Sequence, residues 1–259
     1  MRDLDEGVST TGMIVTGISR SRVPAAFEPV VGAAAREFRA VAPIEASLHL
    51  YGSVATGRGR TSRSDVDLLT LGLPATVGAA MSARLSLRFA DRCRSVDIAC
   101  TGFGDLLDEG DEAYGNRVFL RHYCLLLVGP DPVDRSVEYP ADLRAARGFN
   151  GDIAQHLRRW RASLATGADP STVGRTAARK SLLAVAGLVS VHDRAWTTDR
   201  VASAERWSTI DPPIAVGLAT LLDWIDRDDG LKTEQVGAAL DGPVAAIVDT
   251  FDRTIGLWR

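Results

Sequence analysis

The feature that most constrains the fold is a change of hydrophobic pattern near residue 134. Before it, segments of strand length alternate with segments whose apolar residues recur at helical spacing. After it, the strand signals nearly disappear and only helical periodicity remains. The 259 residues can bury one large core or two smaller ones, and usual domain sizes favour two. We therefore expect an α/β (α+β) fold, with a mixed sheet and its helices followed by a C-terminal helical bundle.

The individual segments can be assigned from their periodicity. Strands are expected at residues 47–51, 65–71, 95–100 and 123–128. Helices are expected at residues 24–41, 75–90, 112–121, 153–164, 172–191, 214–225 and 243–257. Three prolines cluster between residues 130 and 140, and we place the domain boundary beside them, near residues 135–142. The predicted divisions are a flexible N-terminal segment at 1–21, a sheet domain at 22–137 and a helical domain at 138–259.

Composition and charge disfavour several classes of function. The formal net charge is −3 and the arginines are scattered, so a basic stripe for a nucleic-acid backbone is not expected. The longest apolar runs are far shorter than the roughly 20 residues that span a bilayer, and the N-terminus lacks an apolar signal-peptide core. We expect a cytoplasmic protein with no membrane partner. The three cysteines show no CxxC spacing, which favours reduced, mostly buried thiols, and nothing in the sequence indicates the oligomeric state.

Residues 51–68 carry the groups that suggest a chemistry. Tyr51-Gly52-Ser53 follows a predicted strand, and after eleven further residues comes Asp65-Val66-Asp67-Leu68. In a regular strand, Asp65 and Asp67 would project to one side about 7 Å apart. Two such carboxylates repel each other unless a cation such as Mg²⁺ binds between them. Asp97 is the candidate third acid, because an ionised carboxylate inside an apolar strand is expensive to bury without a counter-charge.

Gly52 and Ser53 are the candidate phosphate contacts. Glycine lets the backbone approach a phosphate closely, and Ser53 offers a hydroxyl and an N–H at the start of an expected helix, whose positive end favours anions. The loop before Asp65 ends in Arg63 and Ser64. Its arginines either contact a triphosphate or lie in solvent.

The combination of strand, Gly-Ser turn, eleven-residue spacer, Asp-x-Asp strand and later acid resembles the polymerase-beta-like nucleotidyltransferase superfamily. The resemblance covers residues 50–69. It implies that residues 22–137 form the nucleotidyltransferase domain and that Asp65, Asp67 and Asp97 are the catalytic acids and metal ligands, holding two Mg²⁺ ions. It also implies transfer of a nucleoside monophosphate from ATP or another nucleotide triphosphate to a hydroxyl, with release of pyrophosphate.

A looser resemblance extends to the adenylyltransferases that modify the aminoglycoside antibiotics streptomycin and spectinomycin. It rests on Leu-His-Leu-Tyr-Gly-Ser, on Val-Gly-Pro after the fourth predicted strand, on the helical C-terminal domain, and on Thr197-Thr198-Asp199 leading to Ala-Glu-Arg-Trp. Asp97 stands where those antibiotic-resistance enzymes carry a glutamate, which leaves the acceptor open. In such enzymes the helical bundle completes the cleft. Arg175, Arg179 and Lys180 would then bind nucleotide phosphates, or else form a solvated helix face.

The sequence therefore predicts a Mg²⁺-dependent nucleotidyltransferase that acts on a hydroxyl-bearing small molecule, with an aminoglycoside as one candidate acceptor. Asp97 would be the general base as well as a ligand. Two alternatives stay open. One is a nucleotidyltransferase that modifies a protein or RNA, as in toxin–antitoxin pairs, and the other is a nucleotide-binding regulator without turnover.

Overall fold

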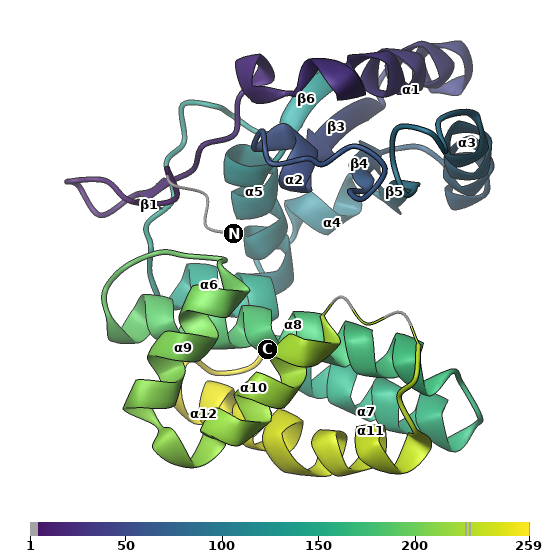
Figure 1. Ribbon diagram of the computed structural model, residues 1–259. Coiled ribbons are helices and arrows are strands. Elements are labelled where there is room, and N and C mark those ends of the chain that lie inside the picture. The colour runs from purple at the N-terminus through teal and green to yellow at the C-terminus, as the bar shows by residue number, and fades with distance from the viewer. Residues whose placement is uncertain (1–4, 226, 228, 259) are drawn as a thin grey trace. The chain divides into compact units, whose positions relative to one another are not determined.

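The computed structural model describes residues 5–225, 227 and 229–258 (Figure 1). The chain divides into two compact units. The sheet unit comprises Thr16–Glu109 and Asn116–Glu138, and the helical unit comprises Met1–Val15, Gly110–Gly115 and Tyr139–Arg259. None of the helices within the described residues combines the length and apolar character that a bilayer crossing requires.

The sheet unit is built on a mixed four-stranded sheet. Its strands are β3 (Ser47–Tyr51), β4 (Val66–Leu71), β5 (Val96–Thr101) and β6 (Leu125–Val128), in the order β5-β4-β3-β6. Strand β3 is antiparallel to both neighbours, whereas β4 and β5 are parallel. A parallel pair needs a crossover connection, which α3 (Ala75–Arg88) supplies. The four strands lie within two residues of the ranges that the sequence predicts.

The two faces of this sheet have different environments, because side chains alternate along a strand. One face, with Leu48, Leu50 and Leu68, forms the main core together with α3 and α1 (Glu28–Val41). The opposite face carries Tyr51, Leu69 and Leu71 and packs against a smaller apolar cluster. The remaining elements of this part of the chain are η1 (Arg20–Arg22), η2 (Ala25–Phe27), α2 (Gly52–Ala55), α4 (Gly104–Leu107) and α5 (Asp111–Tyr123). Helix α5 begins in residues of the helical unit and ends in the sheet unit.

The three cysteines of the sheet unit are free thiols, with Cys93 and Cys124 buried and Cys100 half-buried. Burial raises the pKa of the Cys124 thiol well above its usual range. The environment around Cys124 is therefore apolar and does not favour a reactive thiolate.

The helical unit is organised around one long helix, α8 (Pro170–His192). Its side chains are buried along most of its length, and the other helices pack around it. It begins two residues earlier than the apolar pattern predicts, because Asp169 accepts a hydrogen bond from the N–H of Thr172 and Pro170 occupies the first helical position. The surrounding elements are α6 (Leu143–Asn150), α7 (Ile153–Ala165), α9 (Arg200–Ile210), η3 (Pro212–Ile214), α10 (Ala215–Trp224), α11 (Thr233–Ala239), η4 (Leu240–Val244) and α12 (Ala245–Thr254).

The segment predicted to be flexible, residues 1–21, contains regular structure. Strands β1 (Gly7–Val8) and β2 (Ile14–Val15) pair as an antiparallel hairpin. The buried carboxylate of Glu6 accepts hydrogen bonds at 2.8 Å from both the N–H and the hydroxyl of Thr198. The hairpin is thereby attached to the loop between α8 and α9. Residues 1–4 of the predicted segment lie outside the described residues.

Candidate functional site

Two of the predicted acids lie opposite each other on neighbouring strands. Asp67 of β4 is in register with Asp97 of β5, and on its other side Asp67 is in register with Tyr51 of β3. Neighbouring strands lie about 4.8 Å apart, and residues in register point to the same face of the sheet. The two carboxylates and the Tyr51 ring therefore share one face.

Gly52 packs directly against the Asp67 carboxylate. Its φ of +74° is in the left-handed region, and a Cβ added there would lie 2.3 Å from Asp67 Oδ2. Glycine is needed both for the turn and for the close approach. Helix α2, which starts at Gly52, has only four residues. The expectation that a helix dipole would favour phosphate at Ser53 therefore finds little support, because so short a helix has a small dipole.

The structure corrects the expected surroundings of Asp97. The sequence suggests a carboxylate inside a buried strand, yet Asp97 is exposed. The reason is the strand order, which puts β5 at the edge of the sheet. Asp97 thus needs no buried counter-charge, and it is open to solvent and solutes.

Asp65 differs from the expectation in another way. Strand β4 begins at Val66, so Asp65 precedes it. Its carboxylate accepts two hydrogen bonds from the Arg94 guanidinium, one of them from Nε to Oδ1 at 2.9 Å, and a third from Ser95 Oγ to Oδ1 at 2.7 Å. Sequence reasoning missed Arg94 and Ser95. They become visible only when the pairing of Val66 with Val96 shows that Asp65 lies next to the residues before β5.

Tyr51 provides an apolar, protonated neighbour for the acids. Burial, followed by the charges of Asp67 and Asp97, raises the pKa of its phenol above the ordinary value of 10. Its ring makes an edge-to-face contact with Phe119 of α5, with 5.3 Å between the ring centroids. The phenol therefore stays neutral at physiological pH and fixes one wall beside Asp67.

A divalent cation fits part of this arrangement. Mg²⁺ is commonly bound by one or two carboxylates, with waters and phosphates as the other ligands, and Asp67 and Asp97 offer such a pair. Within the described residues, however, the His, Cys, Asp and Glu side chains form no group of three or more that could hold a metal. The three-acid arrangement expected for two ions is therefore not formed among the described residues. Both oxygens of Asp65 are instead bound by Arg94.

The loop before Asp65 is folded by its own hydrogen bonds. Ser64 Oγ accepts from the N–H of Arg60 at 2.9 Å, and the carbonyl oxygen of Ser64 accepts from the N–H of Arg94 at 3.1 Å. Ser64 therefore has a structural role at the entry to β4. Arg63 is exposed, and its assignment to the triphosphate stays a prediction.

The three predicted phosphate ligands of α8 make contacts within the helical unit. Arg175 Nη1 donates to the carbonyl oxygen of Arg227 at 3.3 Å, and Arg179 Nε donates to that of Ile225 at 2.9 Å. Both arginines thus bind carbonyl groups that follow α10. The four-residue spacing of Arg175 and Arg179 predicts that they lie on one face of α8, and these two contacts agree with that prediction. The assignment of the two arginines to phosphates stays a prediction.

Lys180 has a buried carboxylate as its partner. Its Nζ lies 2.7 Å from Asp152 Oδ1 and donates to the carbonyl oxygen of Phe149 at 3.0 Å, while His156 Nε2 lies 2.9 Å from Asp152 Oδ2. Burial by itself would raise the pKa of Asp152, but the contacts with His156 and Lys180 outweigh it and lower that pKa. Lys180 therefore helps to keep a buried carboxylate ionised, and its predicted role at the phosphates is untested.

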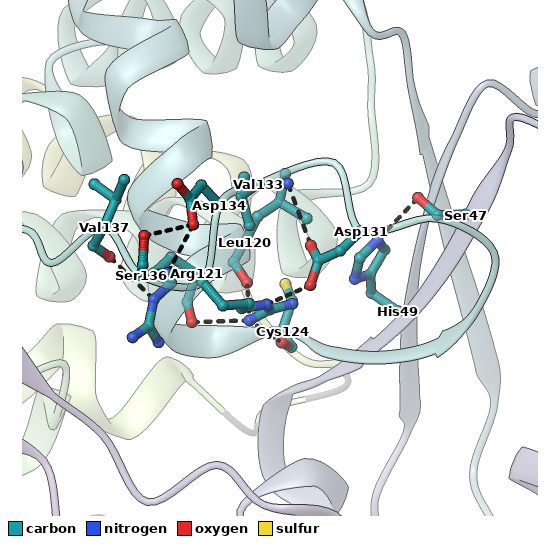
Figure 2. A network of polar contacts seen from close by, with 11 residues as sticks. Ser47, His49, Leu120, Arg121, Cys124, Asp131, Val133, Asp134, Ser136 and Val137 are labelled. Atoms are coloured by element: carbon teal, nitrogen blue, oxygen red, sulfur yellow. Dashed lines mark hydrogen bonds and ion pairs between the residues drawn. The ribbon is translucent and has the colours of Figure 1, made fainter.

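A polar network supports the strand that leads to Tyr51 and Gly52 (Figure 2). Arg135 Nη1 donates to the carbonyl oxygens of Arg121 at 3.1 Å and Leu120 at 3.3 Å, at the end of α5, and Arg135 Nε donates to Asp131 at 2.5 Å. Close to Asp131 lies the buried His49 of β3, whose Nε2 is 3.0 Å from Ser47 Oγ. The network joins the segment after β6 to the end of α5 beside β3.

No model of a known protein family matches this chain, and no curated protein is significantly similar to it in sequence. The functional assignment therefore rests on the geometry and chemistry of the residues described above.

Proposed function

We propose that this protein is a divalent-metal-dependent nucleotidyltransferase that transfers a nucleoside monophosphate, in the first instance AMP from ATP, to a hydroxyl group of a small molecule. The observation that carries the proposal is the pairing of Asp67 with Asp97 on adjacent strands, with the backbone of Gly52 directly against the Asp67 carboxylate. Two carboxylates side by side on adjacent strands repel each other, so they do not stabilise the sheet. Their pairing is better explained by the binding of a cation than by a structural role.

Each residue of the site has a distinct task in this proposal. Asp67 and Asp97 hold the cation, which when bound neutralises charge on the triphosphate and on the departing pyrophosphate. Because Gly52 has no Cβ, the Asp67 carboxylate lies directly against the Gly52-Ser53 turn, and the backbone and hydroxyl of this turn would contact a phosphate of the nucleotide. Asp97 is exposed at the sheet edge, where an acceptor hydroxyl can approach and pass its proton to the carboxylate.

The acceptor is expected to be a small molecule whose hydroxyl reaches this exposed edge. A polycationic acceptor such as an aminoglycoside, which the loose family resemblance suggests, would be attracted by the adjacent carboxylates. Residues 51–53 and 65–67 define the nucleotide side of the reaction more closely than the acceptor side.

The central test measures pyrophosphate release by the full chain with each of the four ribonucleoside triphosphates, Mg²⁺ and a panel of hydroxyl acceptors. Asp67→Asn should lower turnover by about a thousandfold or more, because it removes a ligand charge while keeping the side-chain shape. Asp91→Asn is the matched control, since the Asp91 side chain is 75% exposed and pairs with Arg92. It should leave turnover unchanged.

The outcomes separate the candidate functions. Release that requires an aminoglycoside supports antibiotic modification, whereas release that requires a protein or RNA supports a macromolecular modifier. Tight ATP binding with no release in the presence of any acceptor supports a regulator. Full turnover by Asp67→Asn with unchanged circular dichroism would refute the proposed mechanism.

A further inference from the structure

The ion pair between Asp65 and Arg94 suggests how the cation site is assembled. We propose that Arg94 is a positioning residue that withholds Asp65 from the cation, so that the cation gains Asp65 as a ligand only when the ion pair opens. This inference rests on the proposed function and concerns the strength of metal binding at the same site.

The contacts of Asp65 engage both carboxylate oxygens. Oδ1 accepts from Arg94 Nε at 2.9 Å and from Ser95 Oγ at 2.7 Å, and Oδ2 accepts from Arg94 Nη2. A two-point arginine–carboxylate contact of this kind is among the stronger charge-assisted hydrogen bonds. A metal ion that binds Asp65 must compete with the guanidinium for the same oxygens.

The backbone around this contact is fixed on both sides. The N–H of Arg94 donates to the carbonyl oxygen of Ser64 at 3.1 Å, and the N–H of Val66 donates to that of Ser95 at 2.9 Å. These hydrogen bonds join the segment before β4 to the segment before β5. The Arg94 side chain is therefore held next to Asp65 by the same pairing that sets Asp67 beside Asp97.

The two partners differ in exposure, which indicates how the pair opens. The Arg94 side chain is 47% exposed and that of Asp65 only 17%. Arg94 can rotate into solvent without leaving a buried cation behind, whereas Asp65 would need a replacement for the lost charge. An incoming divalent cation supplies that replacement. Opening an ion pair of this exposure costs free energy, so the intact pair should make the metal affinity of the wild type about threefold to thirtyfold weaker than it would be without the pair.

The test measures Mn²⁺ binding to the full chain, without nucleotide, from the electron paramagnetic resonance signal of free Mn²⁺. Arg94→Gln should bind Mn²⁺ about threefold to thirtyfold more tightly than the wild type. Arg94→Lys, which keeps the charge but loses the two-point contact, should show a smaller gain. Arg84→Gln is the matched control, because Arg84 is an exposed arginine of the same unit that pairs with Glu37 at 3.2 Å.

A double-mutant cycle identifies the residue through which Arg94 acts. In an Asp65→Asn background, Arg94→Gln should no longer change Mn²⁺ affinity beyond the effect of Arg84→Gln, because the carboxylate that Arg94 is proposed to withhold is no longer present. If Arg94→Gln instead matches Arg84→Gln in the wild-type background, or weakens binding, Arg94 does not withhold Asp65 and the inference is wrong.

The failure of this inference can be distinguished from failure of the proposed function. Mn²⁺ binding that Asp67→Asn abolishes and Arg94→Gln leaves unchanged would keep the metal site and overturn the role of Arg94. No detectable Mn²⁺ binding by the wild type or by Arg94→Gln would overturn the metal site and, with it, the inference. Arg94→Lys supplies the answer if Arg94→Gln does not fold.

Discussion

Acid should destabilise the sheet unit, because His49 is buried on β3 in its neutral form. The imidazole has no exposed surface, and its Nδ1 has no hydrogen-bond partner within the described residues. Burial lowers the pKa of His49 from 6.5 to about 4; Asp131 opposes this effect and Arg135 adds to it. In the unfolded chain the same imidazole is free to take up a proton near its ordinary pKa.

The sign and size of the effect follow from proton linkage. Between the two pKa values the unfolded state binds more protons, so the free energy of unfolding falls as the pH falls. The stabilisation is fully present above pH 6.5 and is lost as the pH decreases toward about 4. The full difference corresponds to about 3 kcal/mol, at about 1.4 kcal/mol for each pKa unit, and about 2 kcal/mol is lost between pH 7.5 and pH 5.

His49→Gln tests this reasoning, because glutamine can keep a hydrogen bond to Ser47 but does not titrate. The variant should lose about 2 kcal/mol less than the wild type on going from about pH 7.5 to about pH 5. Part of the dependence should remain, since burial also lowers the pKa of His122 to about 4. The exposed His192 of α8 provides the control, and His192→Gln should retain the full wild-type difference.

The assay must report on the correct unit. All five tryptophans lie between residues 160 and 258, so their fluorescence reports on the helical unit. Pulse-labelling hydrogen exchange in urea, read by mass spectrometry on peptides from β3 and β4, follows the sheet unit directly. An undiminished pH dependence in His49→Gln, or a nuclear magnetic resonance titration of His49 near pH 6.5 in the folded protein, would refute the argument.

Two further variants test the framework around the site. Gly52→Ala should destabilise the sheet unit by about 1–2 kcal/mol, because an alanine at positive φ is strained. It should also weaken Mn²⁺ binding, because the added Cβ displaces the Asp67 carboxylate. A Gly52→Ala variant that binds Mn²⁺ as tightly as the wild type in a titration would contradict this. Arg135→Ala should cost about 2–3 kcal/mol by the exchange assay, because two carbonyl groups of α5 and Asp131 lose a charged donor. Arg135→Lys should recover part of that loss.

Much of the fold follows from local patterns. The strand at 47–51 is predicted residue for residue, and the other three strands of the sheet lie within two residues of their expected ranges. Helix α7 lies within one residue of its expected range, whereas α1 begins four residues after its expected start, because Ala25–Phe27 form the separate helix η2. Helix α9 is not predicted, because its apolar periodicity is weak; the one local signal of its start is Asp199, which precedes it and accepts hydrogen bonds from two backbone N–H groups.

The candidate site was predictable in its residues but not in its contacts. The Gly-Ser turn and Asp67 could be selected because glycine and paired carboxylates have few other uses in that pattern. The exposure of Asp97 and the pairing of Asp65 with Arg94 could not. Both depend on which strands are neighbours, and residues 29 positions apart give no local signal of their contact.

By itself, the sequence determined the segments, their periodicity and the residue types able to bind a cation and a phosphate. Those properties arise from interactions between residues close in the chain, such as the alternation of a strand or the freedom of a glycine. Only the tertiary structure decided that β5 is an edge strand, that Asp67 and Asp97 lie in register, and that Arg94 binds Asp65. These features depend on long-range strand pairing, which is set by how whole faces of the sheet are buried.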